Sequence, residues 1–278
     1  MSVLLVMAKA PVPGRVKTRL CPPLDPAAAA AVAAAALLDT LDAVRAVPGV
    51  TPVLAHAGPL DRAVRGAELG AALAGWTLLP QRGRDLGDRL AAAHADAAAA
   101  FPGRPVLQLG MDTPQAGADL LGAAVVALAG ADAVLGPAAD GGWWALGLRD
   151  PGAAAVLRTV PMSTPATGRE TRAALAGRGL RVDALPELAD VDEWSTALAV
   201  AAAAPAGRFA ATVRDLESRL AGGTAPETDV RPADGLLGVV RPVKGGLTGT
   251  RATAAGRSEA GRTVRSGPVT ARRAREVR

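Results

Sequence analysis

The chain has 278 residues, half of them hydrophobic, which is enough for one large domain or two small ones with a buried core. Its net charge of +5 comes from the C-terminal part, because residues 221–278 hold 11 basic and 5 acidic residues whereas residues 1–220 hold 20 and 21. This distribution argues against specific nucleic-acid binding by the globular part. No window holds about 18 consecutive strongly apolar residues, so no membrane-spanning segment is expected. The single cysteine, Cys21, excludes an intramolecular disulfide and favours a cytoplasmic location.

Apolar runs and alanine-rich stretches alternate along the first 220 residues. The run at 3–8 (VLLVMA) has no basic segment before it and ends in a basic loop, which predicts a buried strand rather than a signal peptide. Residues 26–47 predict a long alanine-rich helix with proline in its first turn. Further strands are predicted at 51–56, 76–81, 105–110, 132–137, 143–148 and near 180–185, and further helices at 85–101, 117–129, 167–178 and after 192.

This alternation predicts an α/β fold with a mostly parallel sheet and helices on both faces. Ligands of such sheets bind at the carboxyl ends of strands, which is where the polar motifs of this chain lie. Residues 221–278 are rich in Gly, Thr, Pro, Ala and Arg and lose the hydrophobic periodicity. They predict a disordered basic tail after a single domain at 1–220, and a solvated tail is favoured over one that binds polyanions.

The loop after the first predicted strand, at 8–20 (AKAPVPGRVKTRL), concentrates positive charge. Its four cations are Lys9, Arg15, Lys17 and Arg19. Gly14 allows a backbone turn that other residues resist. The chain has only three lysines against 28 arginines, and two of the three lie in this loop. A di- or triphosphate would balance these charges through charge-assisted hydrogen bonds, although a solvated loop has the same spacing.

Two aspartates are candidate metal ligands. Asp112, in GMDTP at 110–114, lies just beyond the carboxyl end of a predicted strand. Asp192, in DVD at 190–192, precedes the last predicted helices. Carboxylates that converge on one ion would make a minimal Mg²⁺ or Mn²⁺ site, completed by water and substrate oxygens. The structural alternatives are that Asp112 caps a turn and Asp192 caps a helix.

A third candidate segment leads through a glycine pair into an apolar strand. It contains Asp140, Gly141, Gly142 and Trp143. Glycines allow close backbone approach to a ligand, so we place a small-molecule acceptor here, although a tight hairpin explains the same residues. If 143–148 is a strand, Trp143 and Trp144 point to opposite faces, one toward the core and the other toward a pocket.

A helix start near residue 85 is the last candidate. Gly87 lies in the predicted first turn, where a helix N-terminus can face phosphate, and Asp85 is a candidate N-cap. Motifs for other chemistries are absent from the sequence: it has no Cys/His metal cluster, no Walker-type loop and no GxGxxG turn after the first strand. His56 and His94 lie in apolar or alanine-rich surroundings, which predicts structural or solvated histidines.

Taken together and in order, these segments resemble an uncharacterised bacterial group labelled glycosyltransferase A-like, within the nucleotide-diphospho-sugar transferase superfamily. This group is associated with radical-SAM and selenoprotein gene neighbourhoods. The resemblance spans roughly residues 1–205, and the layout is also similar to 2-phospholactate and molybdenum-cofactor guanylyltransferases. The matching segments are AKAPVPGRVKTRL (8–20), LPQRGRDLGDRL (79–90), GMDTP (110–114), LGPAADGGWWALGL (135–148), VPMST (160–164) and ADVDEW (189–194).

The resemblance implies a three-layer α/β/α fold with a nucleotide at the ends of the first strands. It also implies that Asp112 and Asp192 match metal-binding aspartates and that the cations at 9–19 match the family's basic loop. The family often has Thr-Asp-Ser-Pro where this chain has Met-Asp-Thr-Pro at 111–114. It often has tyrosine at Trp143 and Trp144 and tryptophan at Met162, so the acceptor of this chain could differ from that of relatives.

These expectations combine into a metal-dependent transferase with a nucleotide donor and a small-molecule acceptor, and with Asp112 and Lys17 as catalytic residues. The basic loop favours nucleotidyl transfer and the family label favours glycosyl transfer, so the two stay nearly even. Lys9, Gly14, Arg15, Lys17, Arg19 and Gly87 are predicted to bind the nucleotide phosphates. The alternative is a non-catalytic nucleotide-binding or regulatory module, because no dedicated acid–base residue stands out. No membrane partner is expected, and the sequence does not specify an oligomeric state.

Overall fold

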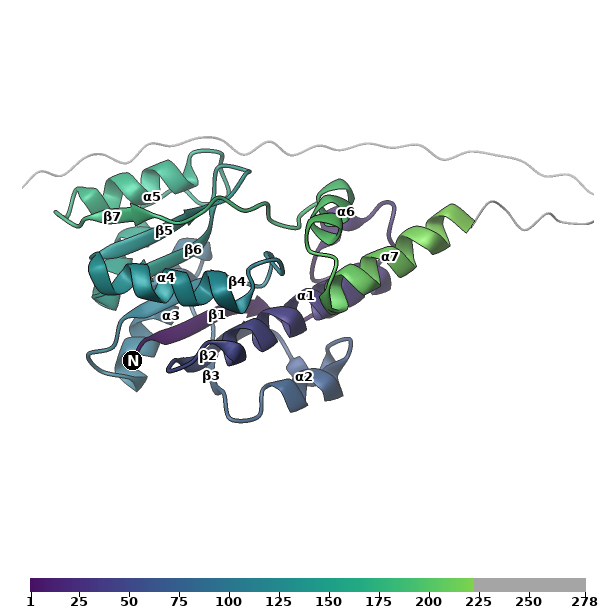
Figure 1. The fold of residues 1–278 in the computed structure, drawn as a ribbon, viewed down its shortest axis with the longest axis horizontal. Helices are drawn as coiled ribbons and strands as arrows, with labels where there is room; N and C mark the ends of the chain where they lie inside the picture. The colour runs from purple at the N-terminus through teal and green to yellow at the C-terminus, as the bar shows by residue number, and fades with distance from the viewer. Residues whose placement is uncertain (223–278) are drawn as a thin grey trace, which may run out of the picture. The chain divides into compact units, whose positions relative to one another are not determined.

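A computed structural model of the protein describes residues 1–222, so the predicted tail lies outside the described residues apart from its first two positions. Seven strands form one sheet in the order β3-β2-β1-β4-β6-β5-β7 (Figure 1). Their bounds are β1 Val3–Lys9, β2 Thr51–Ala57, β3 Thr77–Pro80, β4 Val106–Gly110, β5 Ala133–Pro137, β6 Trp143–Leu148 and β7 Val182–Ala184. All neighbouring pairs are parallel except those of β6, which runs antiparallel to β4 and β5. The predicted mostly parallel sheet is therefore confirmed.

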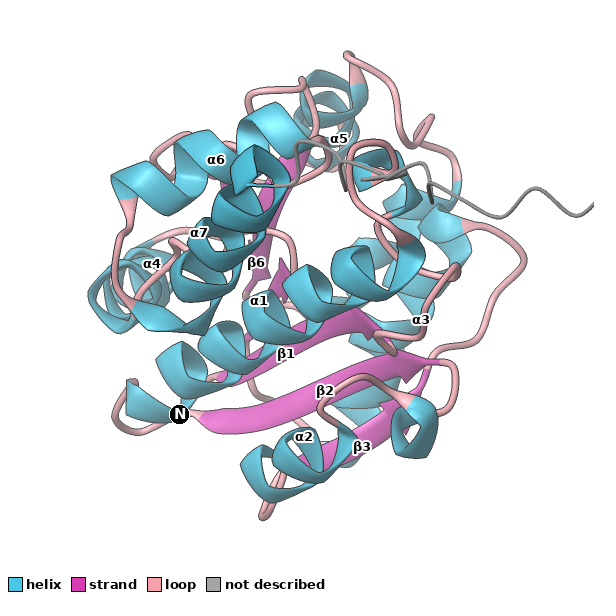
Figure 2. Ribbon diagram, turned by 90° about the vertical axis from the view of Figure 1, so that its right-hand side faces the viewer, coloured by secondary structure: helices cyan, strands magenta, loops and turns pink. Residues whose placement is uncertain are grey.

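Helices cover both faces of the sheet and give three α/β/α layers (Figures 1 and 2). The α-helices are α1 Pro26–Ala46, α2 Gly66–Ala72, α3 Leu86–Ala100, α4 Ala118–Gly130, α5 Thr167–Ala176, α6 Trp194–Ala203 and α7 Gly207–Gly222. The 3₁₀ helices are η1 Thr18–Leu20, η2 Leu60–Arg62 and η3 Pro151–Arg158. Helices α1, α2 and α4 pack on one face, and α3, η3 and α5 pack on the other.

The central strand β1 shows why both layers form. Side chains of a strand alternate between the faces of its sheet, and all six residues from Val3 to Ala8 are buried. Leu4 and Val6 pack into the core beneath α1 and α4, whereas Val3 and Leu5 pack beneath α3 and η3. A continuous apolar run is therefore what a strand covered on both sides requires.

Helix α1 is buried on two sides, because α6 and α7 pack on the side that faces away from the sheet (Figure 2). The side chain of Asp25 caps its N-terminus by accepting a hydrogen bond from the backbone N–H of Ala28 at 2.7 Å. Its alanines allow close packing on both sides. By length and composition alone α1 could cross a membrane, contrary to the expectation from the sequence, yet 67% of its apolar window is buried within the fold.

The sequence prediction missed α2 and η3 as well as the three-residue helices η1 and η2, and the two longer elements follow from tertiary context. Helix α2 is only seven residues long, too short to show a periodic pattern. Helix η3 begins where Asp150 accepts a hydrogen bond from the N–H of Gly152 at 2.9 Å, and it packs against α3. The antiparallel direction of β6 was not predicted either. It brings the amino end of β6 to the same edge as the carboxyl ends of β1 and β4.

Candidate functional site

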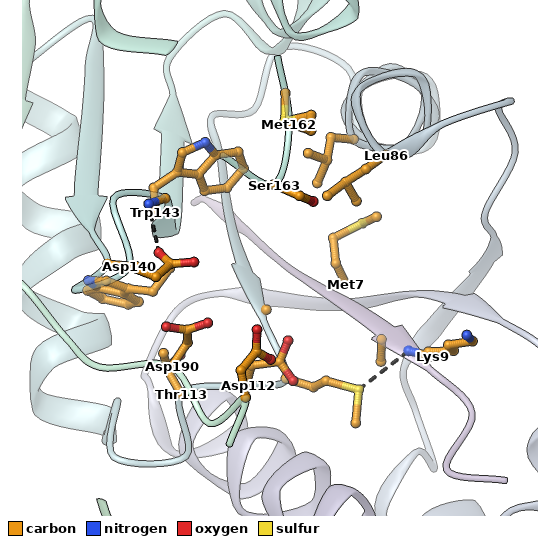
Figure 3. A pocket seen from close by; sticks show the side chains of 18 of the residues that line it. Met7, Lys9, Leu86, Asp112, Thr113, Asp140, Trp143, Met162, Ser163 and Asp190 are labelled. Atoms are coloured by element: carbon orange, nitrogen blue, oxygen red, sulfur yellow. Dashed lines mark hydrogen bonds between the residues drawn. The ribbon is translucent and has the colours of Figure 1, made fainter. Parts of the chain in front are cut away.

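A cavity of about 550 Å³ lies at the edge of the sheet where β1, β2 and β4 end and β6 begins (Figure 3). Residues from the end of each strand line it, including Lys9 from β1, Ala57 from β2, Asp112 after β4 and Trp143 at the start of β6. Segments far apart in sequence meet here because parallel strands all present their carboxyl ends at one edge.

Lys17 lies at the centre of the charged part of this cavity. Its Nζ is 2.6 Å from Oδ1 of Asp112 and 3.0 Å from Oδ1 of Asp192, and its side chain is only 8% exposed. Burial disfavours the charged ammonium, but the two carboxylates outweigh burial and raise the pKa of Lys17 above its usual value. Its backbone adopts a left-handed conformation with φ of +49°, which is uncommon outside glycine. Such local backbone strain often accompanies functional positions.

The carboxylate of Asp192 binds two cations of the first loop. Besides Lys17, Arg19 donates to its Oδ2 at 3.1 Å. Partial burial tends to raise the pKa of Asp192, but Lys17 and Arg19 outweigh burial and lower it. The helix-cap alternative is wrong, because Glu193 occupies the N-cap position of α6 and makes no side-chain capping bond. A backbone hydrogen bond of 2.9 Å from the N–H of Val191 to the carbonyl of Asp112 holds the two acidic segments together.

Asp190 adds an acidic side chain that the sequence analysis did not single out. It lines the same cavity, near Asp112 and Asp140 (Figure 3). Burial and the negative charges of Asp140 and Asp192 raise the pKa of Asp190. Its position two residues before Asp192 in the DVD motif was the available signal. The side chain of Asp140 is fixed by a hydrogen bond of 2.7 Å from the N–H of Gly142.

The remaining predicted phosphate ligands divide into two groups. Lys9 and Arg15 are exposed and line the cavity together with Lys17 and Arg19, and Arg89 of α3, not predicted from sequence, joins them. The two predicted glycines, Gly14 and Gly87, are not among the lining residues. Gly14 instead supplies a positive φ of +72° to the loop.

Gly87 was predicted to bind phosphate and Gly141 to contact the acceptor, but neither glycine lines the cavity. A Cβ at Gly87 would overlap the carbonyl oxygen of Leu157, so this glycine allows α3 to approach η3 closely rather than facing a phosphate. Gly141 packs in the same way against the carbonyl of Pro165, behind the cavity wall. Asp140, Gly142 and Trp143 do line the cavity, on the side that we assigned to the acceptor.

The two tryptophans lie on opposite faces of β6, as the strand prediction requires. Trp144 is 3% exposed, packs in the core beneath α1 and α4, and donates from Nε1 to the carbonyl of Pro186 at 2.9 Å. Trp143 is only partly buried and donates to Oγ1 of Thr171 at 3.2 Å. Trp143 is therefore the tryptophan whose ring is partly exposed, although atoms of both residues line the cavity.

The carboxylates present fit a hard divalent cation. Asp112 and Asp192 supply the oxygen donors that Mg²⁺ and Mn²⁺ prefer, and both already lie within 3.0 Å of one cationic nitrogen. Among the described residues, no group of three or more His, Cys, Asp and Glu side chains is arranged to hold a metal. An ion here would thus take its other ligands from water and substrate, which is the usual pattern for Mg²⁺.

Comparisons with known proteins support the fold class that this architecture defines. Residues 40–164 match the model of a family described as an uncharacterized protein conserved in bacteria (DUF2064). The fold is similar to a candidate nucleotide-diphospho-sugar transferase of Desulfovibrio desulfuricans G20, with a TM-score of 0.68 and 24% identity over 80% of this chain and 96% of that one. The chain therefore has the nucleotide-diphospho-sugar transferase fold. No curated protein matches the sequence.

Two further structures are more distant. The Rv0371C protein of Mycobacterium tuberculosis H37Rv in complex with manganese has a TM-score of 0.43 and 19% identity over 70% of this chain and 96% of that chain. A cytidylyltransferase of Leptospira borgpetersenii serovar Hardjo-bovis has a TM-score of 0.46 and 11% identity over 80% and 96%. The narrower resemblance to the radical-SAM-associated group stays a prediction.

Proposed function

We propose that this chain is a cytoplasmic, metal-dependent transferase that takes a nucleotide as donor and a small molecule as acceptor. The observation that carries the proposal is the meeting of Lys17 with Asp112 and Asp192 on the wall of one cavity at the carboxyl ends of the strands. A cavity of about 550 Å³ lies within the size range of small-molecule sites.

The residues divide the work between charge and orientation. Asp112 and Asp192 would hold a divalent ion, which neutralises the phosphate oxygens of the donor when it is bound. The ammonium of Lys17 would bind a phosphate oxygen as a compact point charge, and Arg15 and Arg19 would bind others at the rim. Catalysis in such a site consists mainly of positioning and of stabilising negative charge on the leaving phosphate.

Nucleotidyl transfer is our first candidate reaction. Four cations of the first loop line the cavity, and a triphosphate carries enough negative charge to engage them. Pyrophosphate would leave, and the nucleoside monophosphate would pass to an acceptor oxygen. Glycosyl transfer is the second candidate, in which a nucleoside diphosphate leaves and a sugar moves. The resemblance of the sequence motifs to the glycosyltransferase A-like group favours this second reaction.

The proposal is tested by a thermal-shift screen of nucleoside triphosphates and nucleotide sugars, each with and without Mg²⁺. A ligand at about 100 times its Kd stabilises a protein by about 2.7 kcal/mol, which such a screen detects. We expect stabilisation that depends on Mg²⁺ in the wild-type chain and is lost in Asp112→Asn. Asp183→Asn, at a half-exposed carboxylate outside the cavity, is the matched control.

Turnover assays then separate the alternatives. Release of pyrophosphate identifies nucleotidyl transfer, and release of a nucleoside diphosphate identifies glycosyl transfer. Mg²⁺-dependent binding without turnover on any acceptor would indicate a non-catalytic nucleotide-binding module. If no nucleotide stabilises the protein, the proposal fails.

A further inference from the structure

The cavity has two chemically different halves (Figure 3). Carboxylates gather on one side, where Figure 3 shows Asp112, Asp140 and Asp190. Apolar side chains gather on the other, where the same figure shows Met7, Leu86, Trp143 and Met162, with Ser163 as a polar side chain among them. We call this second set, together with Leu90, the apolar half. The phosphate chemistry proposed above uses the charged half and leaves the apolar half without a role.

Leu86 shows that this apolar surface is open to a ligand. It begins α3 and is 46% exposed. Five large hydrophobic residues are exposed in the part of the chain that the structure describes: Met1, Leu78, Leu86, Val126 and Leu220. Of these, Leu86 is the one that lines the cavity. A bound molecule with apolar surface would remove this side chain from water, which is favourable.

Trp143 forms a wall of fixed orientation in this half. Its ring donates from Nε1 to Oγ1 of Thr171 at 3.2 Å. Thr171 is fully buried and donates in turn to the carbonyl of Thr167 at 2.8 Å. The indole is thus anchored through its polar edge to α5, and its apolar body is left to face the cavity.

The segment that carries Met162 is held by the same helix. Thr167 donates from Oγ1 to the carbonyl of Pro161 at 2.9 Å and accepts from the N–H of Thr164 at 3.0 Å. Ser163, which lies between Pro161 and Thr164 in the sequence, has a φ of +59°, an uncommon conformation for serine. Hydrogen bonds thus fix the chain on both sides of Met162. A wall that is already ordered loses little conformational entropy when a ligand binds.

From this geometry, and given the proposed transferase function, we propose that the acceptor is amphipathic. Its alkyl or aryl body lies against the apolar half, and its reacting hydroxyl or phosphate oxygen points toward Asp112 and Asp140. A nucleobase fits this half less well, because Met7, Leu86 and Met162 offer its hydrogen-bonding edge no partner, although the hydroxyl of Ser163 lies among them. The amide nitrogen of Gln81, which could have read a base, already donates to the carbonyls of Ala8 and Ala55 at 3.0 and 2.9 Å.

The test compares probes with the same phosphate group and different bodies. The full chain is titrated by calorimetry with hexyl phosphate, phenyl phosphate and glycerol 3-phosphate, in Mg²⁺ with the best-stabilising nucleotide bound as a non-hydrolysable analogue. We expect the two apolar probes to bind at least about tenfold more tightly than glycerol 3-phosphate. Their hexyl and phenyl groups bury apolar surface, whereas the glycerol body carries hydroxyl groups that would lose their hydrogen bonds to water. Equal affinities, or tighter binding of glycerol 3-phosphate, would overturn the proposal.

Two variants locate the binding of the apolar probes. Leu86→Gln and Met162→Gln should each weaken hexyl phosphate about fivefold and leave the nucleotide Kd unchanged. Leu78→Gln is the control, because Leu78 is 45% exposed, like Leu86, but lies outside the cavity. A weaker nucleotide Kd in both variants would mean that the apolar half holds the base, and the proposal would be wrong. If no nucleotide binds at all, the proposed function fails, and the probes are then compared in Mg²⁺ alone.

Discussion

The side-chain nitrogen of Lys17 lies 2.6 Å from the carboxylate of Asp112, and this ion pair joins the loop after β1 to the end of β4. The same nitrogen binds Asp192, which is 175 residues away in sequence. The lysine side chain is buried, whereas the side chains of Asp112 and Asp192 are 42% and 39% exposed and line the cavity. The two carboxylates are therefore not shielded from a ligand by their ion pairs with Lys17. A ligand can therefore compete for both sides of the pair.

Asp112→Asn should lower turnover by about two to three orders of magnitude, the cost typical for loss of a charged group that stabilises a transition state. The fold should survive, because asparagine keeps the shape and the backbone bond to Val191 is untouched. Steady-state kinetics at saturating Mg²⁺ and a denaturation curve check the two parts. An unchanged kcat would remove Asp112 from the mechanism.

Lys17→Met tests the phosphate role of the ammonium. Methionine fills the buried channel of the lysine stem but removes a charge-assisted hydrogen bond worth about 1.5–3 kcal/mol. We expect the Kd of the preferred nucleotide to rise at least about tenfold in Mg²⁺. Arg169→Met is the control, because Arg169 is 77% exposed and pairs with Glu170 away from the cavity. Equal Kd values for the two variants would show that the ammonium serves structure alone.

Gly87→Ala separates a packing role from a phosphate-binding role. An added Cβ would overlap the carbonyl of Leu157, so α3 and η3 must move apart. We expect a loss of about 1–3 kcal/mol in the free energy of unfolding, as overpacking commonly costs. Gly122→Ala, where a Cβ would meet nothing within 4 Å, should leave stability unchanged or raise it. Denaturant unfolding distinguishes the two, and an unaffected Gly87→Ala stability combined with weaker nucleotide binding would restore the sequence prediction.

Local sequence signals were sufficient for most of the fold. The strand at β1 is a continuous apolar run, and the side chain of Asp85 caps α3 as predicted. The features that the sequence prediction missed depend on contacts between residues far apart in the sequence. The seven residues of α2 have no pattern of their own, and the reversed direction of β6 is decided by its pairing with β4 and β5.

The charged part of the site was predictable because loops that follow parallel strands meet at one edge. This rule brings Asp112 to the basic loop. It does not specify which groups turn inward, so Asp190 and Arg89 were missed. The error at Gly87 has a related cause, since a glycine in the first turn of a helix looks the same in sequence whether it faces a ligand or the backbone of another helix.

Asp39→Ala should weaken the attachment of α7 to α1. Asp39 is a residue of α1 that accepts hydrogen bonds from the N–H groups of Arg208 and Phe209 at 3.0 and 2.8 Å, at the start of α7. The carboxylate is 13% exposed, so its loss leaves two partly buried N–H donors without a partner, and we expect a destabilisation of about 1–3 kcal/mol. Hydrogen exchange should show that α7 loses protection first. Asp42→Ala, at a carboxylate that is 51% exposed and whose only ion-pair partner within residues 1–222 is Arg208, should cost less than about 1 kcal/mol.

The fully buried His94 in α3 predicts a specific dependence of stability on acid pH. Burial lowers the pKa of His94 from 6.5 to about 4, and the amide of Gln108 offsets only part of this effect. In the described residues, neither ring nitrogen has a partner with hydrogen-bond geometry. The imidazole is therefore neutral in the folded protein at neutral pH, behind the wall to which Gln108 belongs.

The sign of the effect follows from proton linkage. Between pH 6.5 and pH 4 the unfolded chain binds a proton at His94 that the folded chain does not, so the free energy of unfolding falls as the pH falls. The loss reaches about 3 kcal/mol near pH 4. His94→Leu removes this contribution, so its stability should fall less than that of the wild type between pH 7 and pH 4.5. Urea unfolding at several pH values measures the difference, with His56→Gln, at a partly exposed histidine, as the control that should follow the wild type. Parallel stability curves for wild type and His94→Leu would show that His94 titrates normally in the folded protein.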